Sequence, residues 1–85
     1  MYYFTVLEPE TDYNNIGTIS LKPGEELTDK IQRACESHFD ADITVLSCPD
    51  PLELVRGEAD EVRVRVEQAG VTYEMTLDIK QTVIY

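Results

Sequence analysis

The feature that most constrains the fold is a strict alternation of apolar and polar side chains near the C-terminus. Its apolar members are Val62, Val64, Val66, Val71, Tyr73, Met75, Leu77 and Ile79. Because strand side chains point alternately to opposite faces, the alternation predicts two strands, each with one buried face. A two-residue turn at Ala69-Gly70 sets Val66 opposite Tyr73 and Arg65 opposite Glu74. A three-residue loop would set valines against charges, so we expect the two-residue hairpin.

A second pattern, of helical period, follows Pro23-Gly24. Between Glu25 and Phe39 one stripe recurs at intervals of three and four residues, formed by Leu27, Ile31, Ala34, Cys35 and His38. This spacing predicts an amphipathic helix with one buried face. Its exposed face has two acid-first pairs at i, i+4 spacing, Glu26–Lys30 and Asp29–Arg33, which favour a helix. No Ser, Thr, Asp or Asn stands directly before Glu25, so the predicted helix has a weak N-cap.

Three further segments have the composition of strands, namely Tyr2–Leu7, Ile16–Lys22 and Ile43–Cys48, and a short helical turn is expected at Leu52–Arg56. The order is therefore ββαβββ, with one amphipathic helix packed on a mainly antiparallel sheet. We expect a single small α+β domain over residues 1–85, since a second core would need roughly 50 more residues. Gln81–Tyr85 either prolongs the last strand or pairs beside the first.

The hairpin followed by Lys22-Pro23-Gly24-Glu25-Glu26-Leu27 and a helix resembles the β-grasp folds typified by ubiquitin. The resemblance covers about the first 45 residues and lies in the order of elements, with no shared motif. The chain ends in Val83-Ile84-Tyr85 and lacks the C-terminal Gly-Gly through which ubiquitin and the sulfur carriers act. Conjugation and sulfur transfer are therefore not expected.

The net charge is −10, from 17 acidic and 7 basic side chains. Such a surface repels nucleic-acid phosphates and anionic membranes, so we expect neither as a direct partner, and it attracts basic proteins. The plain alternative is that acidity only keeps a small protein soluble. The chain shows no signal peptide, no apolar run of membrane-spanning length and too few cysteines for a disulfide scaffold, so a cytoplasmic location is expected.

Eleven of the 17 carboxylates fall into three clusters in the sequence, which are the candidate partner-binding residues: Glu8, Glu10 and Asp12; Glu25, Glu26 and Asp29; and Asp50, Glu53, Glu58, Asp60 and Glu61. Alternate residues of an extended chain repeat at about 6.6 Å, close to the spacing of phosphates along one nucleic-acid strand. Rows of this kind would allow the protein to occupy a nucleic-acid-binding groove as a mimic. The alternative is a set of solvated loops.

Cys35-x-x-His38, with Cys48, is the one arrangement that suggests metal or cysteine chemistry. A zinc site needs about four ligands, and the chain has no second Cys/His pair. Cys35 lies on the apolar stripe, where cysteine commonly serves as a small hydrophobe. A Cys/His pair that points into a core also lacks solvent access and an oxyanion site. We therefore expect no cofactor, no catalytic residue and no enzymatic activity.

No motif in the sequence fixes an activity, so three hypotheses follow. The leading one is a non-enzymatic acidic module that docks on a basic, nucleic-acid-binding protein and inhibits it. Phage and mobile-element anti-defence proteins and toxin-immunity proteins share this size and charge, a likeness of composition only. The second is an assembly module that forms a homodimer through terminal strands at a sheet edge, although those strands can instead pair with each other. The third is a small metal-binding protein using Cys35, His38 and Cys48.

Overall fold

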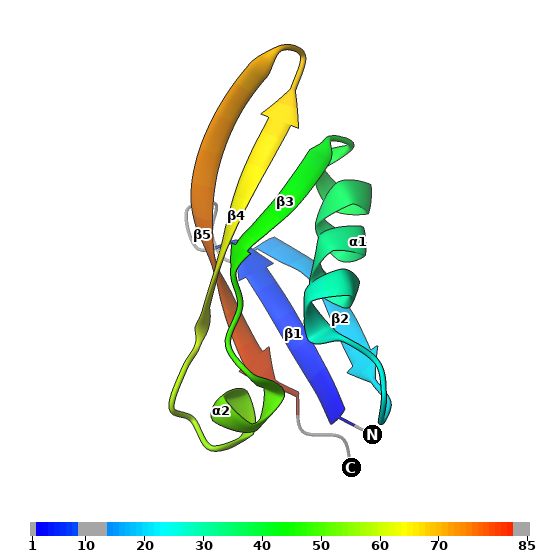
Figure 1. The fold of residues 1–85 in the computed structure, drawn as a ribbon, viewed down its shortest axis with the longest axis vertical. Helices are drawn as coiled ribbons and strands as arrows, with labels where there is room; N and C mark the ends of the chain where they lie inside the picture. The colour runs from blue at the N-terminus through cyan, green and yellow to red at the C-terminus, as the bar shows by residue number, and fades with distance from the viewer. Residues whose placement is uncertain (1, 9–13, 83–85) are drawn as a thin grey trace.

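The computed structural model describes residues 2–8 and 14–82, which form five strands and two helices (Figure 1). Their bounds are β1 Tyr2–Glu8, β2 Asn14–Leu21, α1 Leu27–Phe39, β3 Asp42–Ser47, α2 Pro51–Val55, β4 Glu61–Gln68 and β5 Val71–Gln81. The order of the long elements is ββαβββ, so the expected α+β class is confirmed. The predicted bounds differ from these by one or two residues, and Val83–Tyr85 lie outside the described part.

The five strands form one curled antiparallel sheet in the order β2-β1-β5-β4-β3. Helix α1 lies across one face and packs against both outer strands, β2 and β3 (Figure 1). The described parts of β1 and β5 pair with each other, and this pairing continues where the Thr82 N–H donates to the Tyr3 carbonyl at 2.7 Å. The strands nearest the termini are therefore internal, and the edges of the sheet are β2 and β3.

The β4–β5 hairpin has the predicted register. Val66 faces Tyr73, Val64 faces Met75 and Val62 faces Leu77. The turn residues Ala69 and Gly70 both have positive φ, 52° and 78°, as the two central residues of a type I′ turn require. On the opposite face Arg65 and Glu74 approach to 3.8 Å, which confirms the expected cross-strand pair.

The core lies between α1 and the concave face of the sheet. Its fully buried side chains come from β1, α1, β4 and β5, and are Phe4, Val6, Ile31, Cys35, Val62, Val64, Val66, Leu77 and Ile79. Each of these valine, leucine, isoleucine and phenylalanine side chains contributes about 1.5–3 kcal/mol of transfer free energy. Leu54 of α2 also belongs to this core. Of the predicted helix stripe, Leu27, Ile31 and Cys35 are buried and Ala34 packs against them.

Helix α1 starts two residues later than predicted, because Glu25 and Glu26 belong to the turn before it. The Glu25 carboxylate accepts a hydrogen bond from the Lys22 N–H at 2.8 Å. Glu26 is the N-cap residue, with extended backbone and no side-chain cap bond, which confirms the weak cap. Within the described residues, neither helix has the length and apolar character needed to cross a membrane.

Candidate protein-binding surface

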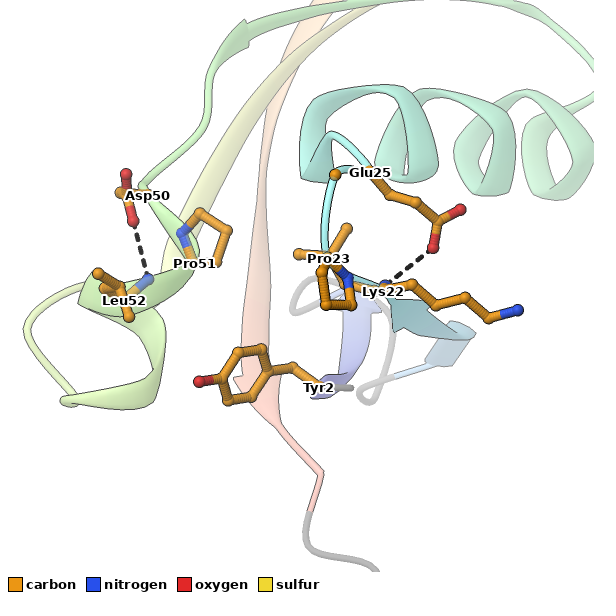
Figure 2. Close-up of a pocket in the computed structure, with 9 residues that line it drawn as sticks. Tyr2, Lys22, Pro23, Glu25, Asp50, Pro51 and Leu52 are labelled. Carbon is orange, nitrogen blue, oxygen red and sulfur yellow. Dashed lines mark hydrogen bonds between the residues drawn. The ribbon is translucent and has the colours of Figure 1, made fainter.

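One hollow lies between the end of β2, the turn into α1 and the start of α2 (Figure 2). Its volume is about 320 Å³, and its walls are Tyr2, Leu21, Lys22, Pro23, Gly24, Glu25, Asp50, Pro51 and Leu52. Tyr2 is 40 % and Leu52 50 % exposed, so two large apolar side chains are uncovered along this groove. Glu25 and Asp50, which belong to two different sequence clusters, stand on opposite sides of it (Figure 2).

An adjoining hollow of about 530 Å³ is lined by members of both the second and the third acidic cluster. Its lining includes the carboxylates of Glu25, Glu26, Asp50 and Glu53. Residues 25 and 26 are some 25 positions from residues 50 and 53, and the sequence alone did not indicate that they meet. The remaining members of the third cluster do not line this hollow: Glu58 and Asp60 lie on the connection from α2 to β4, and Glu61 begins β4.

Most carboxylates around these two hollows are engaged by the protein's own structure. Glu25 accepts from the Lys22 N–H and lies 3.0 Å from the Lys30 ammonium. These contacts, the backbone N–H first, lower the pKa of Glu25. Lys30 thus pairs with Glu25 instead of the expected Glu26. At α2, Asp50 accepts from the Leu52 N–H at 2.9 Å and Glu53 accepts from the Asp50 N–H at 3.3 Å, a capping box.

The first sequence cluster is only partly described, because Glu10 and Asp12 lie outside the described residues. Glu8 ends β1, and its carboxylate lies 3.5 Å from His38 Nε2. His38 was expected on the buried stripe of the helix. It reaches Glu8 instead, while its ring meets the Phe39 ring edge-on at 4.8 Å. This contact joins the end of α1 to the end of β1.

A second acidic hollow, of about 410 Å³, lies at the C-terminal end of α1. It is lined by Glu36, Asp40, Ala41, Asp42, Glu67, Gln68 and Ala69, and we call its four carboxylates, Glu36, Asp40, Asp42 and Glu67, the acidic end. Asp42 of β3 stands directly opposite Glu67 of β4. Asp40 follows the helix in the left-handed region at φ 50°. The carbonyl of Phe39 is capped by the Gln68 amide, which donates to it at 3.0 Å.

Within residues 2–8 and 14–82, none of these four side chains has an ion-pair or hydrogen-bond partner. The three sequence clusters did not include them, because they come from three separate elements. One signal was present. Matching Ile43 to the alternating face of β4 places Ile43 opposite Val66, and the preceding residue, Asp42, then falls opposite Glu67.

Next to the acidic end, the tip of the β4–β5 hairpin leaves apolar side chains uncovered. Val71 is 60 % and Tyr73 40 % exposed, although Leu77 and Ile79 on the same side of β5 are fully buried. In Figure 1 the hairpin tip projects past the end of α1. The helix therefore does not cover the tip of the hairpin (Figure 1).

The proposed metal ligands Cys35, His38 and Cys48 do not form a site. Among the described residues, no group of three or more His, Cys, Asp or Glu side chains is placed to hold a metal ion. Cys35 is fully buried, and burial, with a smaller contribution from Glu36, raises the pKa of its thiol to about 11. Burial also raises the pKa of the Cys48 thiol. Both cysteines are free thiols, and Cys35 serves as a core residue.

A scan against protein-family models found no match, and no curated protein sequence or solved structure matched the chain either. The β-grasp resemblance therefore stays a likeness in the order of elements, and the surface itself has to carry any functional argument.

Proposed function

We propose that this protein is a non-enzymatic acidic module that docks on a basic partner protein through the acidic end. The observation that supports this is the arrangement of Glu36, Asp40, Asp42 and Glu67 around one hollow whose lining contains no cation. Carboxylates at the C-terminus of a helix oppose its dipole, and like charges directly opposite each other on paired strands repel. A basic partner converts both costs into attraction.

The net charge of −10 supports the same proposal over longer distances. A field of one sign attracts an oppositely charged surface and accelerates its association, most strongly at low salt. Partners with such surfaces include proteins that hold DNA or RNA, and an acidic module seated in their groove would compete with the nucleic acid. Inhibition of a nucleic-acid-binding protein in the cytoplasm is therefore the role we propose, as in anti-defence or toxin-immunity proteins.

The second and third acidic clusters of the sequence contribute less to the proposed binding than the acidic end does. Glu25, Asp50 and Glu53 are engaged by backbone N–H groups or by Lys30, so a partner would have to compete with those contacts. Glu26, Asp29, Glu58, Asp60 and Glu61 add to the long-range field. We place the direct contact at the acidic end, where the described structure holds no such competitor.

The test compares two triple variants that remove the same charge. Glu36→Gln/Asp42→Asn/Glu67→Gln acts at the acidic end, and Glu26→Gln/Asp29→Asn/Glu58→Gln acts elsewhere; each takes the net charge from −10 to −7, since three negative charges are lost. The probe is a fluorescent nona-arginine peptide, followed by anisotropy at low and high NaCl. We expect the acidic-end variant to lose at least about fivefold more affinity than its control, with salt weakening all binding. Equal losses, or binding that ignores salt, would overturn the proposal.

A second candidate function is self-assembly through the edge strand β2. The terminal strands first considered for this role are internal in the described structure, so the proposal moves to the edge. β2, with the sequence NNIGTISL, contains no charged residue and no proline, the usual devices that keep an edge from pairing. Sedimentation at high protein concentration and in 0.5 M NaCl tests this. A dimer that Thr18→Lys disrupts supports it, and a monomer under those conditions removes it.

A further inference from the structure

The uncovered hairpin tip has an unusual composition for an exposed part of a sheet. Side chains on the open faces of antiparallel sheets are commonly polar. Val71 and Tyr73 lie instead on the side of β5 that becomes core at Leu77 and Ile79. They are exposed because α1 ends at Phe39 and the chain turns away into β3 (Figure 1). A short apolar strip is thus left without cover by the described residues.

This strip adjoins the acidic end through the hairpin register. Tyr73 pairs with Val66 and Val71 pairs with Gln68, while Glu67 lies between those two β4 residues. Gln68 and Ala69 themselves line the acidic hollow. Because strand side chains alternate between faces, Glu67 and its partner Asp42 point to the side of the sheet opposite Tyr73. The strip is linked to the acidic end through Gln68, which pairs with Val71 and donates to the carbonyl of Phe39, the residue before Asp40. Glu36 and Asp40 extend from α1, which lies on the same side of the sheet as Tyr73.

We infer that Val71 and Tyr73 form the apolar half of the acidic end, and that the partner presents arginine side chains to it. This rests on the proposed function. The guanidinium of arginine stacks on aromatic rings and binds carboxylates through two parallel hydrogen bonds, whereas the ammonium of lysine is a compact, strongly hydrated point charge. A ring beside uncompensated carboxylates therefore selects arginine over lysine. The occupant of this surface is an arginine-bearing face of a basic protein.

The experiment compares nona-arginine with nona-lysine on the wild type and on Tyr73→Thr, which keeps a strand-forming residue at that position. A matched control exists, because Tyr2 at the other end of the molecule is also 40 % exposed. We expect the wild type to bind nona-arginine about threefold to fivefold more tightly than nona-lysine. Tyr73→Thr should reduce this preference, whereas Tyr73→Phe and the control Tyr2→Thr should keep it in full.

Each outcome separates this inference from the proposed function. If Tyr73→Thr keeps the arginine preference undiminished while the carboxylate variants still weaken binding, the apolar half is wrong and the acidic docking surface stands. If both charge variants weaken binding equally, the docking surface fails as well. Amide chemical shifts locate the contact independently. Peptide-induced shifts at Asp40–Asp42 and Gln68–Tyr73 support the inference, and shifts centred on Tyr2 and Leu52 overturn it.

Discussion

The two ends of helix α1 carry the same kind of side chain in opposite electrostatic settings. At the N-terminal end, Glu26 and Asp29 lie where the helix dipole favours negative charge, and Glu25 is held by a backbone N–H and by Lys30. At the C-terminal end, Glu36 and Asp40 lie where the dipole disfavours negative charge. The one basic side chain of the last turn, His38, faces Glu8 instead.

This difference separates acidity that serves folding from acidity that folding does not explain. The N-terminal carboxylates would be useful in a protein with no partner, because they cap turns and suit the dipole. The acidic end weakens the isolated domain, since it adds a like-charge pair between strands, Asp42 and Glu67, to an unfavourable helix terminus. Residues that break local rules without compensation inside the fold are those most often found at functional sites.

The largest effect on stability is expected at Asp40. Asp40→Gly removes a side chain from a residue at φ 50° and a negative charge from the helix C-terminus, so we expect a gain of about 1–1.5 kcal/mol in the free energy of unfolding. Asp40→Asn, which removes only the charge, should give about 0.3–1 kcal/mol. Urea unfolding measures both. If neither variant is more stable than the wild type, the charge at this end is compensated and the comparison between the two ends fails.

A somewhat smaller gain is expected from the cross-strand pair. Glu67→Lys converts a like-charge pair with Asp42 into an opposite-charge pair, which should raise the free energy of unfolding by about 0.5–1 kcal/mol. The control is Glu74→Lys on the same hairpin, which opposes a lysine to Arg65 and should cost a few tenths of a kcal/mol, because that pair is exposed. Both effects should shrink in 0.5 M NaCl. A gain that does not respond to salt would show that packing, not charge, is responsible.

The sequence predicted the fold correctly wherever an apolar repeat ran long enough to define the buried face of a strand or helix. The alternation from Val62 to Ile79 defined the β4–β5 hairpin and its register, because a slip of one residue would bury Arg63 and Arg65. The helical stripe defined the buried side of α1. The prediction that His38 lies on this buried stripe was wrong, because a histidine at a helix end can reach a neighbouring strand. The sequence does not decide which strands are internal, because two apolar terminal strands suit both a monomer and a dimer.

The candidate surface was much less predictable than the fold. Some of the carboxylates that cluster in the sequence have a structural role. Asp50 and Glu53, for example, cap the N-terminus of α2, where acidic residues are favoured. The acidic end is built from α1, β3 and β4, so only the pairing of β3 with β4 brings its members together. The exposure of Tyr73 depends on where α1 ends relative to the hairpin tip, a tertiary relation that no local pattern contains.

The smallest effect, and the one that tests the N-terminal side of the comparison, is expected at Glu25. Its pKa is lowered in the folded protein from the ordinary value of 4.5, first by the Lys22 N–H and then by Lys30. A group whose pKa falls on folding stabilises the fold above its unfolded pKa, and that stabilisation is lost as the pH falls through the folded pKa. Glu25→Gln should therefore be slightly less stable than the wild type at pH 7, and the difference should be smaller at pH 3, as measured by urea unfolding. Glu67→Gln at the other end should instead show no loss at pH 7. A Glu25→Gln deficit that is the same at both pH values would mean that shape, not charge, gives Glu25 its role.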